Sequence, residues 1–484
     1  MKKSILLGCI AACALSATVA SADTKAPAVV KPTADEMKTA FAEFINENAQ
    51  VGTLLDLNKI TVKAVGNDFD VTLPAFSGGD INVKPQTIRL TYAGGFNDHA
   101  QYKIETPFES IQSLFKNVLP DATLNTESAD IMTVWAPAYN LVTKSSQNIK
   151  GLKLSIPNTM DFSMGSLASD TLVRVVSSDK MDAADTSDGQ DVRIVAENAE
   201  IIVPSFSYES ALSGSDITSD PIKQMLSCNS NVFKYSLPDI QLKMQGSAAP
   251  IASFSLQGQG SYQNEIFHFE NKIGNITSPT LGAFAPAALI PDEISINLDV
   301  EGISKDVLAK LAKKAQDKSY TDEDVPALKQ AIETGVIKLN LLEAKNSLAG
   351  MALSGTIRGK LKNAETVKTL LDVQANLIPI IDAKVVITNF DKISPEPKVD
   401  QLQCDRATER LNSLDMSAPN AIMQKETAEM QKEIACAPQG GPLDMLRPYL
   451  DLNERVVDTA GETKDTFVIT FEDDVLTING KQAQ

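Results

Sequence analysis

Residues 290–316 read IPDEISINLDVEGISKDVLAKLAKKAQ, and this stretch carries the clearest secondary-structure pattern of the chain. Its first half alternates apolar and polar side chains, which is the period of an antiparallel strand with one buried face. The apolar positions are Ile294, Ile296, Leu298 and Val300. Gly302 ends the strand, and Ser304 can cap a helix after it. Apolar residues then recur at helical spacing, at Val307, Leu308, Leu311 and Ala315. The stretch therefore predicts a strand followed directly by an amphipathic helix.

The same two periods recur along the chain. Thr33 and Glu36 form a capping box, which predicts a helix over 34–48. Gly66-Asn67 separates two alternating runs and predicts a β-hairpin of 59–65 with 68–73. Further short strands are expected at 152–156, 171–176, 192–195 and 201–203, with a turn at 187–189 before the third of them. The pattern favours an α+β fold of large antiparallel, strongly twisted sheets interleaved with amphipathic helices, elongated as a whole.

A run rich in Pro, Gly and Ala at 278–288 indicates a domain boundary. We expect a signal peptide over 1–22, an N-terminal β-rich domain over 23–280 and a C-terminal strand-helix domain over 281–484. The C-terminal domain carries a helical insert at 401–436, broken near residues 417–419.

The first 22 residues have the pattern of a bacterial secretory signal. Lys2-Lys3 forms the basic region, and residues 4–19 are apolar but too short for a bilayer span, which needs about 20 residues. Residues 20–22 read Ala-Ser-Ala, a cleavage signal. Export to the periplasm, or secretion, is therefore expected, with lipidation at Cys13 as a minority alternative. No other stretch is long and apolar enough to predict a transmembrane segment.

The chain is acidic. Its 484 residues carry 44 Lys and Arg against 62 Asp and Glu, a formal charge of -18. Loss of Lys2-Lys3 with the signal would make this -20. Such a surface repels nucleic acid and anionic headgroups, so neither is an expected partner. Trp135 is the single Trp, which does not indicate a stacking platform for sugars or bases.

Three cysteines remain after the expected cleavage, and an exported location permits disulfides. Cys404 and Cys436 flank one helical segment and are the predicted pair. Closing that loop contributes about 3–4 kcal/mol in the chain-entropy model. Cys228 is then a buried thiol or an intermolecular partner.

Two weak chemical patterns stand out. His99 and His268 lie far apart, and nothing local completes a zinc site or a catalytic triad around either. Ser113 and Lys116 form an S-x-x-K, the spacing of some serine acyl-enzymes, without the accompanying motifs.

An acidic run surrounds the expected turn at Gly189 and consists of Asp179, Asp182, Asp185, Asp188 and Asp191. Flexible acidic loops can bind calcium, but the EF-hand spacing fails here. A solvated loop is the favoured interpretation. We assign no catalytic, cofactor-binding or metal-ligating residue and expect no cofactor.

Three segments carry a family resemblance: IPDEISINLDVEGIS, SLAGMALSGTIRG and the terminal LTINGK. Together they resemble an uncharacterised family of exported proteobacterial proteins with a domain of unknown function, itself distantly similar to AsmA-like envelope proteins. The resemblance covers about the last 200 residues. It implies long antiparallel sheets interleaved with helices in the periplasm, and it brings no catalytic residues. The chain departs from AsmA-like proteins in lacking a persistent membrane anchor.

These observations favour a non-enzymatic periplasmic protein that binds or scaffolds in the envelope. A lipid or an envelope protein is the expected partner, and the oligomeric state is open. A secreted hydrolase using Ser113 and Lys116, and a surface or adhesion protein, are the alternatives.

Overall fold

The computed structural model describes most of the chain after the expected signal. The described residues are 29–49, 57–78, 81–83, 85–105, 108–109, 111–112, 116, 121–247, 249–278, 289–317, 319–394, 399–414, 421–437, 443–450, 455–457, 459, 461–472 and 474–483. Most of the strands belong to one large, open antiparallel sheet, and a separate hairpin pairs β3 (Phe76–Gly78) with β4 (Ile81–Val83). The large antiparallel sheet with interspersed helices confirms that part of the predicted fold. The strong twist and the elongation stay predictions.

The N-terminal helix and hairpin form as predicted. α2 (Ala34–Ala49) begins at the Thr33–Glu36 capping box, in which each residue hydrogen-bonds the other's backbone N–H. β1 (Thr61–Val65) pairs with β2 (Asp68–Leu73) across the turn. The 3-10 turn η1 (Leu57–Lys59) precedes this hairpin. Met37 and Phe41 of α2 are buried against the sheet. Their partners are Ile60, Phe69, Val71, Leu90, Ala100, Tyr102, Ile104 and Trp135.

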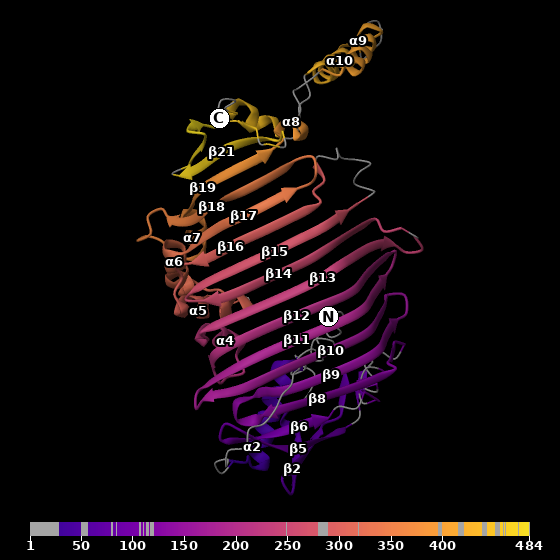
Figure 1. Ribbon diagram of the computed structural model, residues 1–484, viewed down its shortest axis with the longest axis vertical. Coiled ribbons are helices and arrows are strands. Elements are labelled where there is room, and N and C mark those ends of the chain that lie inside the picture. The colour runs from indigo at the N-terminus through magenta and orange to yellow at the C-terminus, as the bar shows by residue number, and fades with distance from the viewer. Residues whose placement is uncertain are drawn as a thin grey trace. The chain divides into compact units, whose positions relative to one another are not determined.

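The strands that follow form antiparallel pairs, which run in sequence order from β8 (Ser128–Ala136) to β15 (Ile266–Thr277) (Figure 1). Before them, β6 (His99–Glu105) pairs with β8, and β7 (Thr123–Asn125) pairs with β9 (Leu141–Ile156). The shorter ones are β5 (Gln86–Phe96), β6 (His99–Glu105), β7 (Thr123–Asn125) and β8 (Ser128–Ala136), which the 3-10 turn η2 (Pro137–Tyr139) follows. The longer ones are β9 (Leu141–Ile156), β10 (Met160–Ser177), β11 (Lys180–Ala196), β12 (Ala199–Asp216), β13 (Ser230–Met244), β14 (Ala252–Gln263) and β15 (Ile266–Thr277).

The turn predicted at residues 187–189 is wrong, because β11 runs straight through it. Ser187 and Gly189 pair with β10 on one side and with β12 on the other. The backbone groups of this segment are therefore used in the middle of the sheet, where a turn would leave them without partners.

The stretch at 290–316 forms the expected strand and helix, β16 (Glu293–Glu301) and α5 (Lys305–Asp317). Gly302 joins them at φ +82°, and a Cβ there would lie 2.1 Å from the Thr334 carbonyl oxygen. Only glycine fits that position without strain. Both faces of β16 are half-buried, so its polar residues are not simply solvated as predicted.

Four helices gather at one end of the long strands (Figure 1). They are α4 (Pro221–Ser227), α5, α6 (Val325–Thr334) and α7 (Leu370–Asn376), with the 3-10 turn η5 (Asp322–Asp324) before α6. Val325, Leu361, Val367 and Val373 form a small core beneath α6 and α7. Capping boxes at Thr321 and Thr369 begin η5 and α7.

The remaining strands are β17 (Val336–Lys345), β18 (Gly350–Leu361), β19 (Leu377–Thr388), β20 (Val456–Val457), β21 (Thr463–Glu472), β22 (Val475–Ile478) and β23 (Lys481–Gln482). The other C-terminal helices are α8 (Phe390–Ile393), α9 (Gln401–Asn412), α10 (Ala421–Cys436) and the 3-10 helix η6 (Asp444–Tyr449). The terminal hairpin packs Phe467 and Ile478 on Ile387 and Phe390.

By its internal contacts the chain divides into two units. The first comprises Met1–Thr280, Ser295–Asn340 and Arg358–Ile378, and the second comprises Leu281–Ile294, Leu341–Ile357 and Pro379–Gln484. The predicted division at 280/281 stays a prediction, although the first change of unit falls there.

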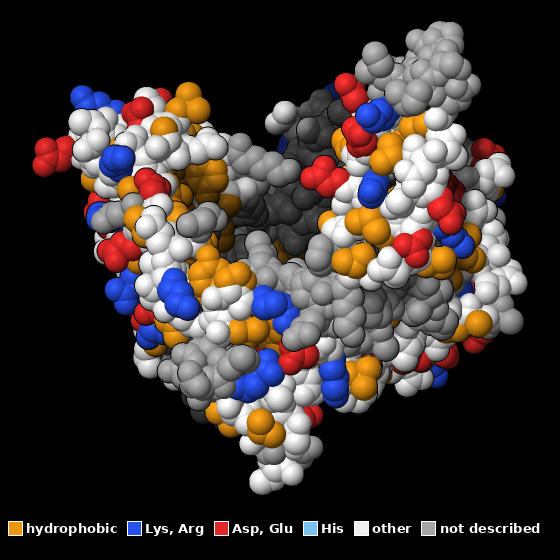
Figure 2. Space-filling model, turned by 90° about the horizontal axis from the view of Figure 1, so that it is seen from above, with side chains coloured by type: hydrophobic (Ala, Val, Ile, Leu, Met, Phe, Trp, Pro, Cys, Tyr) orange, Lys and Arg blue, Asp and Glu red, His pale blue; other side chains and the backbone are white. Residues whose placement is uncertain are grey.

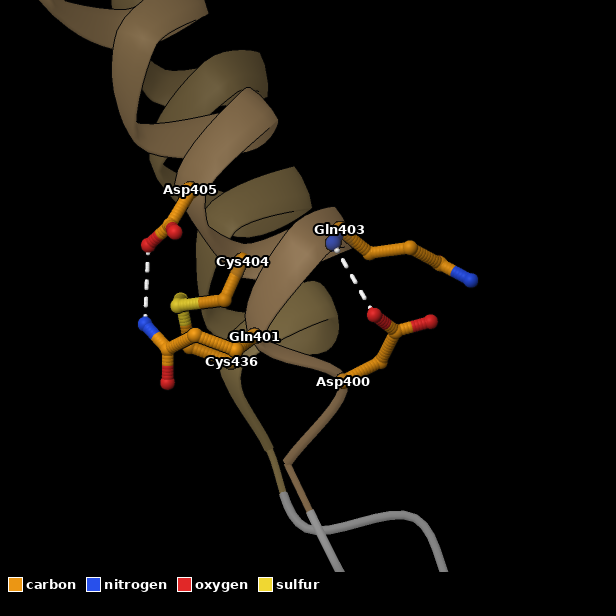
Figure 3. The surroundings of a disulfide bond; sticks show 6 residues. All are labelled: Asp400, Gln401, Gln403, Cys404, Asp405 and Cys436. Carbon is orange, nitrogen blue, oxygen red and sulfur yellow. Dashed lines mark hydrogen bonds between the residues drawn. A yellow bond between two sulfur atoms is a disulfide. The ribbon is translucent and has the colours of Figure 1, made fainter.

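The predicted disulfide is present between Cys404 and Cys436, at the open end of the α9–α10 hairpin (Figure 3). The Asp400 carboxylate accepts from the Gln403 N–H and caps α9, and the Gln401 amide donates to Asp405. No residue of α9 is buried, and Ala428 is the one buried position among the α10 side chains that are described. The hairpin therefore has almost no core of its own, and the disulfide is its main tertiary restraint. The predicted break at 417–419 lies outside the described residues.

Candidate functional site

Strands β9 to β15, all in the first unit, separate two kinds of side chain onto opposite faces. Residues directly opposite each other on neighbouring strands share a face, so the strand register assigns every position. One row of opposite residues consists of Ser145, Thr171, Asp185, Ser210, Phe233, Gly260 and Phe269. The next row consists of Gln147, Ser169, Ser187, Tyr208, Tyr235, Gly258 and Asn271. We call the face that carries these rows the aromatic face.

Along both rows the side chains change from small and polar on β9 to β11 to aromatic or glycine on β12 to β15. The flanking positions on this face continue the apolar part with Phe206, Leu212, Leu237, Leu256, Tyr262, Phe267 and Ile273. Asp185 is the single charged residue in the two rows. Tyr208 is 39% exposed, and the phenylalanines stay partly exposed. An uncharged, partly open aromatic sheet surface of this kind is typical of a binding surface.

The aromatic rings lie over glycines of the neighbouring strand. A Cβ on Gly260 would stand 2.3 Å from the Phe233 ring, and one on Gly258 would stand 2.6 Å from the Tyr235 ring. Gly189 has the same relation to Phe206, at 2.0 Å. Glycine at these positions lets the rings form a smooth floor close to the backbone. Gly189, for which the sequence predicted a turn, instead leaves room for the Phe206 ring.

The aromatic face also holds unsatisfied polar atoms. Six buried side-chain oxygens have no hydrogen-bond partner among the described residues, and five of them lie on this face in β9 to β15. They belong to Gln147, Thr171, Asp185, Tyr262 and Asn271. Buried polar atoms nearly always have partners, so a cluster of exceptions needs an explanation such as a ligand or ordered water.

The opposite face of the same strands is polar and charged. Glu209, Lys234, Glu270 and Lys272 line a concavity of about 420 Å³ together with Ser207, Ser236, Gln257 and Gln259. The Gln259 amide donates to Glu270 at 2.8 Å, and charges of both signs alternate. With two Glu and two Lys among its lining residues, the concavity has no formal net charge.

His268 lies on this charged face and belongs to a hydrogen-bonded group with Asp299 and Asn340. Its Nδ1 is 2.7 Å from Asp299 Oδ1, and the Asn340 amide donates to Asp299 Oδ2 at 2.8 Å. The Asn340 bond, followed by that of His268, lowers the pKa of Asp299. Ser261 is directly opposite His268 on β14, but no hydrogen bond between these two residues is found in the described structure. A Ser-His-Asp triad requires that bond or one formed on substrate binding, together with an oxyanion hole.

The other candidates from the sequence are dispersed or undescribed. Asp182 and Asp188 point to the charged face and Asp185 to the aromatic face, because residues three apart on a strand alternate. No group of three potential metal-ligating side chains occurs among the described residues. Ser113 lies outside them, so the S-x-x-K stays a prediction. His99 contacts Asp98 and the Tyr139 ring.

Cys228 is a buried free thiol, one of the two alternatives predicted for it. It is 2% exposed at the end of α4, and burial raises its pKa. Lys305 lies over the Tyr262 ring nearby, 5.8 Å from the centroid. A thiol with a raised pKa is a poor nucleophile, which indicates a structural role.

The aromatic face was missed from sequence because its polar half resembled a loop. A signal was present, since the F-x-Y of Phe233 and Tyr235 and the G-x-G of Gly258 and Gly260 share a period of two. Which residues of β13 and β14 lie opposite each other depends on the length of the loop between the strands and on the bulge between Leu237 and Ile240. Neither can be read from the sequence.

Within the described part of the chain, no helix is long and apolar enough to cross a membrane. No family model, curated protein or solved structure matches the chain. The resemblance to AsmA-like envelope proteins therefore stays an expectation.

Proposed function

We propose that this protein is a non-enzymatic periplasmic binding protein that holds an apolar or amphipathic small molecule on its aromatic face. The single observation that carries the proposal is the uncharged aromatic-glycine floor of β12 to β15, which remains partly exposed. Aromatic side chains that stay partly exposed are unfavourable in water, so a ligand that covers them gains the free energy of burial.

The chemistry of the floor favours acyl chains or other flexible hydrocarbons. Phe233 and Tyr235 contribute aromatic rings, and the glycines opposite them add no side chain that would interrupt the surface. The floor offers dispersion contacts and few directional ones, which suits a ligand without fixed polar groups along its length. The expected export of the chain places such a ligand in the envelope.

Two adjacent positions on β12 provide a matched test. Tyr208 is on the aromatic face and Glu209 on the charged face, and both are at the surface. We expect the purified protein to bind the apolar dye N-phenylnaphthylamine. Tyr208→Lys should weaken binding by about tenfold or more, which corresponds to about 1.4 kcal/mol. Glu209→Lys introduces the same side chain one residue away and should leave binding unchanged.

Native mass spectrometry of the protein from its envelope supplies a second readout. Absence of dye binding and of any co-purifying amphiphile would refute the proposal. An equal loss of dye binding in both lysine variants would show that the loss comes from a change in net charge or folding and not from the aromatic face.

A further inference from the structure

We infer that the ligand of the aromatic face is an amphiphile with a primary ammonium head group, held by Gln147, Thr171 and Asp185. This inference rests on the proposed function and adds the head-group chemistry. All three residues lie on the aromatic face, at its polar end on β9, β10 and β11. Each carries a buried side-chain oxygen without a partner in the described structure.

The three residues lie on three adjacent strands, one on each. Thr171 is directly opposite Asp185, and Gln147 is opposite Ser169, two residues along from Thr171 on β10. Adjacent strands are about 4.8 Å apart and two residues along a strand about 7 Å, so the backbone positions of Gln147 and Asp185 are about 12 Å apart. Gln147 is 4% exposed and Thr171 is 7% exposed. Unmet hydrogen-bonding capacity at such positions costs about 1–3 kcal/mol for each group.

The neighbouring serines show that the sheet can satisfy its own hydroxyl groups. The Ser169 and Ser187 hydroxyls are 2.5 Å apart, and those of Thr133 and Ser145 are 3.2 Å apart. Gln147, Thr171 and Asp185 are interleaved with these pairs and yet keep an acceptor atom unused. At this polar end the deficit is therefore confined to three residues that can all accept a hydrogen bond. The other two unpartnered oxygens of the aromatic face belong to Tyr262 on β14 and Asn271 on β15.

The charge of the polar end defines the head group further. Asp185 accepts from the Ser210 hydroxyl at 3.0 Å through one oxygen, and its other oxygen has no partner. No Lys or Arg occurs in the two rows of the aromatic face, and no ion pair to Asp185 is found in the described part of the chain. A half-buried carboxylate is stabilised by a cation.

A primary ammonium meets both requirements, since it carries one positive charge and three N–H donors. A hydroxylated head group would supply donors but leave the carboxylate unneutralised. A trimethylammonium would supply the charge but no N–H donor. An anionic head group would be repelled. The apolar part of the molecule would then run from β11 over the aromatic floor toward β15, a distance of four strand spacings, about 19 Å.

Three phospholipids with identical acyl chains test this assignment. We expect the full mature chain to take up phosphatidylethanolamine from mixed detergent micelles at least tenfold better than phosphatidylcholine or phosphatidylglycerol, as counted by native mass spectrometry. Asp185→Asn and Thr171→Val should each remove most of this preference while dye binding on the floor persists. Asp188→Asn, on the charged face of the same strand, should retain it.

Equal uptake of the three lipids, or a preference for phosphatidylglycerol, would overturn the ammonium assignment and leave the proposed function in place. Failure to bind all three lipids and the dye would remove the proposed function itself. Circular dichroism of the variants separates either outcome from misfolding. Thr171→Val removes an unsatisfied hydroxyl, so its thermal midpoint should not fall.

Discussion

At the scale of single residues, Tyr102 shows that an unpaired buried group can belong to the core and not to a site. Its side chain is fully buried beneath α2, and its hydroxyl has no partner among the described residues. Burial, followed by the charges of Tyr92 and Asp68, raises its pKa to about 12. An unfolded tyrosine ionises near pH 10. The contribution of Tyr102 to stability is therefore complete below about pH 10 and is lost as the pH rises toward 12.

Tyr102→Phe should consequently be neutral or stabilising at pH 7, by up to about 1 kcal/mol. It should also reduce the loss of stability between about pH 10 and 12. The urea midpoint at pH 7 and at pH 11 checks both statements. Tyr139→Phe is the matched control, because the Tyr139 hydroxyl donates to Asp98 and accepts from the Asn97 amide. A Tyr102→Phe midpoint lowered as far as that of Tyr139→Phe would mean that the Tyr102 hydroxyl is bonded.

At the scale of strands, the packing of aromatic rings on glycines leads to a prediction about Gly260. Gly260→Ala would place a Cβ 2.3 Å from the Phe233 ring, so the ring must leave the floor. We expect a loss of about 1–3 kcal/mol in stability together with weaker dye binding. The urea midpoint and the dye titration are the measurements. Gly274→Ala, on the adjacent strand and the charged face, meets the flexible Ser255 hydroxyl at 3.1 Å and the Lys272 Cε at 3.7 Å, and it should change neither quantity. If both substitutions lowered stability and dye binding to a similar degree, the packing of rings on glycines would not be what forms the binding surface.

Some elements could be predicted from sequence because one local signal sufficed for each. The capping box at Thr33 predicted α2, and the alternation after Pro291 predicted β16. The position of Cys404 and Cys436 on either side of one helical segment predicted their disulfide. Those signals depend on residues within a few positions of each other, so no knowledge of tertiary structure was required.

The long strands could not be predicted in the same way. β11 is 17 residues long, and its middle, Asp182 to Gln190, carries three Asp together with one Ser, one Thr and one Gly. Such residues favour turns when the chain is considered alone. Here neighbouring strands on both sides use the backbone hydrogen bonds, and Gly189 accommodates the Phe206 ring. The candidate site consists of these middle segments, and its residues become neighbours only through the register of seven strands.

At the scale of the whole molecule, the net charge of -18 opposes the approach to an anionic membrane, whereas the uncharged aromatic floor of β12 to β15 would favour contact with lipid. In Figure 2, Lys, Arg, Asp and Glu side chains are scattered over the visible surface without a large patch of one sign. Repulsion from an anionic membrane is then a property of the total charge, which acts over the Debye length. That length is about 30 Å at 0.01 M salt and about 8 Å at 0.15 M.

Uptake of a fluorescent lipid from vesicles that contain phosphatidylglycerol should therefore become faster as salt is raised from 0.01 M to 0.15 M, by about threefold or more. The direction is opposite to that of a basic membrane-binding protein, whose attraction is screened by the same salt. Vesicles of phosphatidylcholine alone, carrying the same fluorescent lipid, are the control and should show no such increase, because they have no net charge. A rate that falls with salt on the anionic vesicles would show that a local basic surface guides the encounter. A rate that is independent of salt on both vesicles would place the slow step after contact, in the transfer of the lipid from the bilayer to the aromatic face.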